Sequence, residues 1–409
     1  MNFFESIRLA IGSLLQNKLR AFLTLLGIAI GVFAIMGAGT LTSSLKYAVS
    51  DQLAAIGETV FWIEKMPHMG MGNNFRKYRN RKPITYSQFK DLKRQMTTTS
   101  MLSAYTVSMS HTIKSGNLTT NPDVYMIGAD YNFFSNNAYN VEFGRPLTDE
   151  DVNMTKNVAI IGNDVAVKLF PNLNPLDKYI TIKNQTFQIV GILEVKGAML
   201  GQSKDNMVII PITNLLQYFA DEWEESLSIS IKAVSKEMIP ATIDETIGAL
   251  RVIRKVQPWE ENSFELTTNE SISEQFGSFV SFLSAIGWIS GGFALIAAGV
   301  GIMNIMLVSV KERTREIGVR KAVGAKRKWI LMQFIVETVT ICQIGCFFGM
   351  AMGFAGAKLL GKLININTIF PIGWLIGSIV ICTMLGVIFG AYPAWKASNL
   401  DPIDALRYE

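Results

Sequence analysis

Four long apolar runs divide the chain, and each is long enough to cross a lipid bilayer. The runs cover roughly residues 21–45, 276–310, 330–360 and 372–395. Because a helix needs about 20 apolar residues to span the hydrocarbon core, this pattern predicts four transmembrane helices. A long polar stretch separates the first two runs, whereas the other runs follow one another closely.

The flanks of these runs predict further helical segments. Residues 1–20 place apolar side chains at helical spacing with basic side chains elsewhere, which predicts an amphipathic helix at the membrane surface. The alternative is that these residues are the first turns of a longer span. Helical apolar spacing continues beyond residue 45 and also precedes residue 276, so we expect the first two spans to extend as a stalk.

The polar stretch alternates short strand-like and helix-like patterns, which is typical of a soluble α+β domain. Residues 67–82 predict a loop rich in Gly, Met and basic side chains, and residues 179–194 predict a hairpin that turns at Asn184–Gln185. The other predicted elements are strands at 59–64, 104–114, 124–129, 157–162, 206–211 and 227–234, and helices at 83–97, from after 162 through Phe170, and at 239–256.

These patterns divide the chain into eight parts. The parts are 1–20, a cytoplasmic amphipathic helix; 21–57, the first span and stalk; 58–270, an extracytoplasmic α+β domain; 271–310, the stalk and second span; 311–328, a cytoplasmic loop; 329–361, the third span; 371–395, the fourth span; and 396–409, a cytoplasmic tail. Basic segments beside membrane spans face the cytoplasm. Four spans therefore place both termini and the loop at 311–328 on the cytoplasmic side.

Composition and charge agree with a membrane protein. The chain is 49% hydrophobic and has a mean hydropathy of +0.27, which is too apolar for an ordinary soluble protein. Residues 46–274 carry 23 Lys and Arg against 26 Asp and Glu, although the whole chain has a net charge of +5. The positive charge therefore belongs to the membrane flanks and does not argue for a nucleic-acid partner.

The three cysteines lie inside apolar runs and are interpreted as small buried hydrophobes. They are Cys342, Cys346 and Cys382. The soft ligands His68, Met69 and Met71 are too few to predict a metal site. We therefore expect no metal-binding residues, and the two histidines of the chain offer no nucleophile–histidine–acid set for catalysis.

The loop at 311–328 carries the densest charge of the chain. Its basic residues are Lys311, Arg313, Arg315, Arg320, Lys321, Lys326, Arg327 and Lys328, against Glu312 and Glu316. The interleaved acids, with apolar Ile317 and Val319, predict an amphipathic helix that docks another cytoplasmic protein. A patch that binds anionic lipid is the open alternative. We expect Glu337, about two turns into the third span, to contact a basic residue of this loop or to lie near the interface.

Two further groups of residues are candidates for contacts. Small residues four positions apart permit close helix packing, within one chain or in a dimer; they are Gly27 with Gly31 and Gly287 with Gly291. The densest basic cluster outside the membrane flanks consists of Arg76, Lys77, Arg79, Arg81 and Lys82. This cluster either binds anionic lipid or an acidic partner surface, or is a solvated loop.

Three blocks of the sequence closely resemble the signature blocks of the MacB/FtsX-type ABC transporter permeases, the type VII branch of the ABC superfamily. They are NKLRAFLTLLGIAIGV at 17–32, GIMNIMLVSVKERTREIGVRKAVGAKRKWI at 301–330 and YPAWKASNLDPIDALRYE at 392–409. Residues 157–197 also resemble the periplasmic core domain of the MacB branch. The resemblance therefore covers both ends of the chain and the domain between them.

The resemblance implies a fold and a mechanism. It implies four membrane helices, an extracytoplasmic domain with porter and Sabre parts, and a dimer that is either homomeric or built with a similar permease. It also implies that 311–328 is the coupling helix on the ATPase subunit, with Lys311, Arg313, Glu316, Arg320, Lys321, Lys326 and Arg327 as the coupling residues. Members of the family move their outer domains by ATP-driven closure of the cytoplasmic side, which is termed mechanotransmission.

The chain itself contains no G-x-x-x-x-G-K-[ST] phosphate-binding loop. We therefore expect a permease subunit rather than an enzyme, without a cofactor of its own, and ATP and Mg²⁺ bound on a separate P-loop ATPase. The expected location is the bacterial inner membrane, and the expected role is efflux of a drug, peptide or toxin with a periplasmic adaptor and an outer-membrane duct. Lipoprotein release, or FtsX-like activation of a cell-wall hydrolase, is the alternative.

Overall fold

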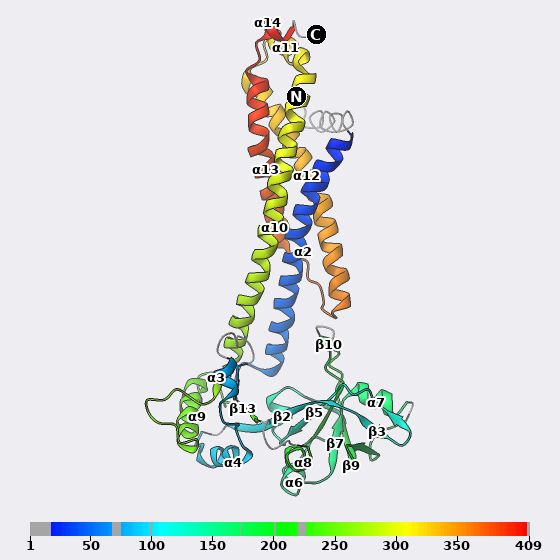
Figure 1. The fold of residues 1–409 in the computed structure, drawn as a ribbon, viewed down its shortest axis with the longest axis vertical. Helices are drawn as coiled ribbons and strands as arrows, with labels where there is room; N and C mark the ends of the chain where they lie inside the picture. The colour runs from blue at the N-terminus through cyan, green and yellow to red at the C-terminus, as the bar shows by residue number, and fades with distance from the viewer. Residues whose placement is uncertain are drawn as a thin grey trace. The chain divides into compact units, whose positions relative to one another are not determined.

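The computed structural model of the protein describes residues 18–67, 75–98, 100–171, 173–199, 202–219 and 226–406. It divides into two compact units (Figure 1). We call Met1–Ala48 with Ser278–Glu409 the helical unit, and Val49–Gly277 the inserted unit. Most of the amphipathic helix predicted at 1–20 lies outside the described residues.

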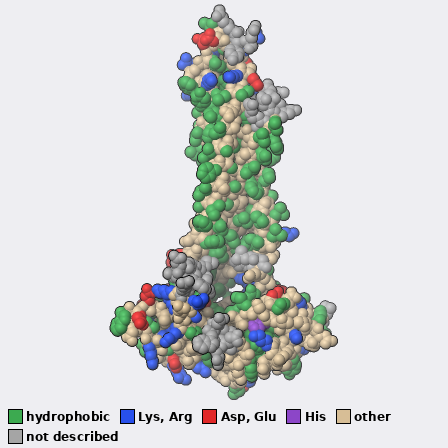
Figure 2. Space-filling model, in the orientation of Figure 1, with side chains coloured by type: hydrophobic (Ala, Val, Ile, Leu, Met, Phe, Trp, Pro, Cys, Tyr) green, Lys and Arg blue, Asp and Glu red, His purple; other side chains and the backbone are tan. Residues whose placement is uncertain are grey.

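Four long helices form the helical unit, and α2 and α10 also extend into the inserted unit. They are α2 (Lys18–Ile56), α10 (Asn269–Glu312), α12 (Arg327–Leu363) and α13 (Ile372–Ser398). Each is long and apolar enough to cross a membrane. Figure 2 shows many hydrophobic side chains on the face of these helices that is in view. Two short helices, α11 (Thr314–Ala322) and α14 (Pro402–Leu406), complete the unit. The predicted set of four membrane helices is therefore confirmed.

The helices pack closely where glycines remove side chains from the contact. A Cβ atom on Gly386 of α13 would lie 2.8 Å from the Cα of Val339, and one on Gly390 would lie 2.7 Å from Thr338 Oγ1. These glycines let α12 and α13 approach until their backbones nearly touch. The buried side chains between the helices include Ile28, Ile302, Phe334, Cys342 and Cys382.

The inserted unit is built on a mixed sheet with short helices, which confirms the predicted α+β class. Among the described residues, twelve strands join in one sheet of order β14-β1-β13-β2-β5-β12-β7-β9-β8-β3-β4, with β6 paired to β9. The β5–β12 and β7–β9 pairs are parallel and the others are antiparallel. The strands are β1 (Val60–Glu64), β2 (Met101–His111), β3 (Ile113–Ser115), β4 (Leu118–Thr119), β5 (Val124–Ala129), β6 (Val141–Gly144), β7 (Val158–Ile161), β8 (Tyr179–Ile182), β9 (Gln185–Leu193), β12 (Met207–Pro211), β13 (Ser228–Lys232) and β14 (Glu265–Thr268), beside the separate pair β10 (Ala198–Met199) and β11 (Gln202–Ser203).

The helices of the inserted unit are α3 (Phe75–Arg79), α4 (Tyr86–Gln95), α5 (Phe133–Asn136), α6 (Asp149–Asn153), α7 (Asn163–Leu169), α8 (Ile212–Tyr218) and α9 (Ile239–Ile253). Helix α4 lies inside the helix predicted at 83–97 and begins later, at Tyr86, because Thr85 caps it with a reciprocal pair of hydrogen bonds to Gln88. The prediction of a loop at 67–82 is wrong over Phe75–Arg79, which forms one helical turn.

The hairpin predicted at 179–194 is present, but its turn lies one residue earlier than predicted. Ile182 pairs with Gln185, so the turn residues are Lys183 and Asn184 rather than Asn184 and Gln185. Both turn residues have positive φ, 43° and 74°. Two-residue turns of this hand match the twist of the strands, and Asn tolerates the left-handed conformation.

Candidate docking site

The segment after α13, which contains α14 and which we call the C-terminal segment, packs against α11 through a glycine contact. A Cβ atom on Gly318 would lie 2.7 Å from the Cβ of Ala405 in α14. Ile317 and Ala405 are buried. Asp401 accepts a hydrogen bond from the Ile403 backbone at 2.8 Å, which supports the first turn of α14. The loop between α10 and α12 is therefore held by residues some 80 positions further along the chain.

Lys321 joins the same two segments by a hydrogen bond. Its Nζ donates to the carbonyl oxygen of Leu400 at 2.7 Å. Burial lowers the pKa of Lys321, and the charge of Arg327 adds to this effect, while Asp401 opposes it. Lys321 is thus committed to an internal contact.

Arg313 connects the end of α10 to the side of α12. Its Nη1 lies 3.4 Å from Oε1 of Glu337, and the two side chains are only 15% and 1% exposed. The expectation that Glu337 contacts a basic residue of the loop is therefore confirmed. A buried charge left without its partner is strongly destabilising, so this pair constrains where the loop sits on α12.

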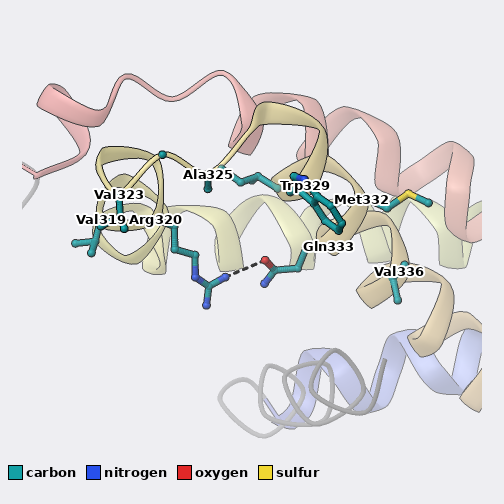
Figure 3. Close-up of a pocket in the computed structure, with 10 residues that line it drawn as sticks. Val319, Arg320, Val323, Ala325, Trp329, Met332, Gln333 and Val336 are labelled. Carbon is teal, nitrogen blue, oxygen red and sulfur yellow. Dashed lines mark hydrogen bonds between the residues drawn. The ribbon is translucent and has the colours of Figure 1, made fainter. Parts of the chain in front are cut away.

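Arg320 makes two contacts with side chains. Its Nη1 donates to Oε1 of Gln333 on α12 at 2.9 Å (Figure 3). It also forms an ion pair with Glu316, one turn earlier on α11. Arg320 and Gln333 line a groove of about 800 Å³ between α11 and the first turns of α12.

The remaining charged residues of the loop face outward. Lys311, Arg315, Lys326, Arg327 and Lys328 are exposed. The seven predicted coupling residues therefore fall into two groups. Arg313, Arg320 and Lys321 hold the loop in place, with Glu316 paired to Arg320. Lys311, Lys326 and Arg327 are available to a partner, together with two residues outside the predicted set, Arg315 and Lys328.

Sequence reasoning missed the apolar part of this surface. Val323 and Trp329 are 84% and 67% exposed, although both lie among charged residues. The sequence did contain a signal for this surface, namely two large apolar side chains inside a strongly charged stretch. Apolar groups exposed together mark binding surfaces.

The four predicted packing glycines lie at one crossing of α2 and α10. A Cβ on Gly27 would lie 3.2 Å from Ala298, and one on Gly287 would lie 2.4 Å from Ala38. Between them, a Cβ on Gly31 would lie 3.1 Å from the carbonyl oxygen of Gly291. These glycines therefore pack two helices of one chain against each other.

The predicted external cluster is divided by contacts within the inserted unit. Arg81 is 10% exposed and its Nη1 lies 2.7 Å from Oε1 of Glu265. Lys77 forms an ion pair with Glu261. Arg79 and Lys82 are exposed, and the side chain of Arg76 lies outside the described residues. Two of the predicted cations are thus paired inside the unit, which leaves a smaller charged surface than the sequence suggested.

Within the described ranges, no three His, Cys, Asp or Glu side chains are grouped to hold a metal ion. Cys342, Cys346 and Cys382 are buried free thiols, as their apolar surroundings predicted. The candidate ligands His68, Met69 and Met71 lie outside the described residues.

Four membrane helices, a mixed α+β domain inserted after the first and a charged loop between the second and third define a multi-pass membrane protein of the permease class. Residues 21–248 match the family of the MacB-like periplasmic core domain, and residues 288–402 match the FtsX-like permease C-terminal region. The chain belongs to the MacB/FtsX-type ABC transporter permeases, and its inserted domain is extracytoplasmic. A permease of this kind works with an ATPase subunit.

Two relatives show how far the similarity extends. The uncharacterized ABC transporter permease YvrN of Bacillus subtilis (strain 168) is 30% identical over 411 residues, which cover 99% of this chain and 100% of that protein. The macrolide export ATP-binding/permease protein MacB of Bdellovibrio bacteriovorus is 30% identical over 407 residues and 99% of this chain, but the chain spans 62% of its length. The crystal structure of the periplasmic region of MacB from Actinobacillus actinomycetemcomitans aligns with a TM-score of 0.45 and 17% identity, covering 56% of this chain and 98% of that one.

Proposed function

We propose that the chain is the permease subunit of an ABC transporter that works by mechanotransmission. A separate P-loop ATPase binds ATP and Mg²⁺ and docks on the loop between α10 and α12. Its closing motion moves α11, and α2 and α10 pass the motion to the inserted domain. The chain acts as a dimer, homomeric or with a similar permease, in the bacterial cytoplasmic membrane with both termini in the cytoplasm.

The loop between α10 and α12 supports docking, because contacts within the chain hold it in place while its exposed side chains are charged. Arg313 and Lys321 attach it to α12 and to the C-terminal segment, so a force on α11 reaches both. Only Arg313 separates the end of α10 from the start of α11, which makes the connection short. The exposed cations, among them Lys311 and Arg315, offer a surface for an acidic partner.

The proposed cargo is a drug, peptide or toxin expelled from the cell envelope. The likeness to proteins named macrolide exporters supports this choice, because the chain matches them from end to end of its own length. A periplasmic adaptor on the inserted domain and an outer-membrane duct complete the proposed assembly. The last three apolar runs contain only two charged side chains, Glu337 and Lys358, which suits a machine that moves its outer domains rather than one that conducts charge.

The test is co-purification of the ATPase from native membranes. In the variant Lys311→Glu/Arg315→Glu, both exposed charges are reversed, and we expect the amount of ATPase retained to fall about tenfold because rim charges govern association. The matched control is Lys358→Glu/Lys362→Glu, which reverses two exposed charges near the other end of α12 and should retain the ATPase. Full retention by the loop variant, or equal loss in both, contradicts docking at this loop.

A further inference from the structure

The groove between α11 and α12 has apolar walls that continue along α12 (Figure 3). Val319 and Val323 line its α11 side, and Trp329, Met332 and Val336 line its α12 side. Met332 is exposed, like Val323 and Trp329. The groove is therefore open. Its apolar walls become buried only when a ligand or a partner occupies it.

The outer end of the groove is strongly cationic. Lys326, Arg327 and Lys328 lie between two lining residues, Ala325 and Trp329, and all three are exposed. Arg320 adds a fourth cation in the groove, although Glu316 and Gln333 share its hydrogen bonds. The loop as a whole carries eight basic and two acidic residues from 311 to 328, so the surrounding field stays positive.

The same three cations crowd the positive end of a helix. Lys326 is the N-cap residue of α12 and makes no side-chain cap hydrogen bond, and the first turn of α12 contains no acidic residue. The first backbone N–H groups of a helix lack intrahelical partners, and the helix dipole adds positive charge there. Basic side chains at this position repel the dipole, and a bound anion would relieve the repulsion.

The inner end of the groove lies at the level of an aromatic pair of α13. Thr338 of α12 packs against Gly390 of α13, so Val336 lies near the level of Tyr392. Tyr392 and Trp395 stack with ring centroids 6.5 Å apart, and such aromatic pairs are enriched where membrane meets water. At 1.5 Å per residue, Val336 and Trp329 are separated by roughly 10 Å along α12, about the depth of a lipid headgroup and its first acyl carbons.

We propose that this groove is a binding site for an anionic phospholipid of the cytoplasmic leaflet. The phosphate lies at Lys326, Arg327 and Lys328, at the N-terminus of α12, and an acyl chain lies along Met332 and Val336. The lipid holds the start of α12 at a fixed depth. This inference depends on α12 spanning the membrane, and it assigns Lys326 and Arg327 to the lipid, which leaves Lys311 and Arg315 for the ATPase. The two proposals are tested separately, since the docking test changes Lys311 and Arg315, which do not line the groove.

The first test is native mass spectrometry of the delipidated full chain, without the ATPase, titrated with dioleoyl phosphatidylglycerol or dioleoyl phosphatidylcholine. We expect the first phosphatidylglycerol to bind at least about tenfold more tightly, because each nearby cation strengthens binding of an anionic headgroup. Lys326→Gln/Arg327→Gln/Lys328→Gln should abolish this preference. The control Lys358→Gln/Lys362→Gln should keep it. A preference that survives the triple substitution, or that the control also loses, overturns the proposal.

The second test locates the lipid. Lipids with brominated acyl chains quench nearby tryptophan, and the difference between wild type and Trp329→Phe isolates the signal of Trp329. We expect brominated phosphatidylglycerol to quench this signal more than brominated phosphatidylcholine. Loss of the difference on adding excess inorganic phosphate would make the site one for free phosphate. Loss on adding the ATPase at every lipid content would assign the groove to the ATPase. Either result overturns the lipid site.

Discussion

At the scale of single residues, the ion pair of Arg313 and Glu337 determines how the loop is attached. Because Glu337 is almost fully buried, Glu337→Gln leaves the Arg313 guanidinium without a counter-charge. We expect a loss of stability of about 3 kcal/mol, the cost typical of a buried pair that loses one partner. Thermal unfolding of the detergent-solubilised chain, followed by intrinsic fluorescence, measures this loss as a lower melting temperature.

Two variants separate the pair from a general effect of charge. Glu312→Gln removes an exposed acid at the end of α10, next to Arg313, and should leave the melting temperature nearly unchanged. The swap Arg313→Glu/Glu337→Arg restores opposite charges and should recover part of the loss. If Glu337→Gln and Glu312→Gln melt together, the pair does not hold the loop.

At the scale of elements, the crossing of α2 and α10 depends on which face of α10 a glycine occupies. A Cβ on Gly291 would lie 2.4 Å from Ile35 and 2.8 Å from the carbonyl oxygen of Gly31, whereas a Cβ on Gly292 has open space around it. Gly291→Val should therefore push the helices apart and destabilise the bundle by roughly 1–3 kcal/mol, the usual cost of overpacking.

Gly292→Val is the matched control, since it introduces the same side chain one residue later on the same helix. Both substitutions change the intrinsic helix propensity equally, so their difference in melting temperature reports the crossing alone. Equal melting temperatures for the two variants would show that α2 and α10 do not pack through Gly291.

At the scale of the whole molecule, the sequence alone predicted the membrane helices and most strands of the large sheet, but not several short elements such as α5 and α6, nor the contacts that give the charges their roles. Long apolar runs predicted four membrane helices, and short apolar runs predicted strands such as β12, which is buried along its whole length, because uninterrupted apolar runs mark fully buried segments. The short helix α3 was missed, since one turn has no period to detect.

The candidate docking site shows more clearly that sequence patterns do not reveal which side chains contact each other. The basic loop was evident from its charge, but sequence could not separate the internal cations from the outward ones. That separation depends on partners 24 and 79 positions away, Glu337 for Arg313 and Leu400 for Lys321. The position of Glu337 predicted a contact with a basic residue of the loop, but local periodicity could not say which one, and it carried no information about Leu400. The cations of the predicted external cluster also do not form one exposed surface, because Arg81 pairs with Glu265, which is distant in the sequence.

The inserted unit provides the last prediction, since it contains three hydrophobic clusters of its own and should fold as the isolated segment Val49–Gly277. Asp130 is buried in it, and desolvation raises its pKa to about 6 despite opposing effects of Ser103 and Lys93. A raised folded-state pKa favours the protonated form, so its stabilisation is complete below about pH 4 and is lost as the pH rises through 6.

Asp130→Asn mimics the protonated side chain and should therefore prevent the loss of stability at higher pH. Urea unfolding at pH 4.5 and 7.5 should therefore show the variant gaining on wild type by roughly 1–3 kcal/mol at the higher pH, the scale set by 1.36 kcal/mol per pKa unit. Comparing the two proteins at each pH cancels the titration of other carboxylates. The control Asp244→Asn, at an exposed position of α9, should show no such change. A segment that unfolds without cooperativity contradicts independent folding, whereas cooperative unfolding with a pH-independent gap contradicts the buried state of Asp130.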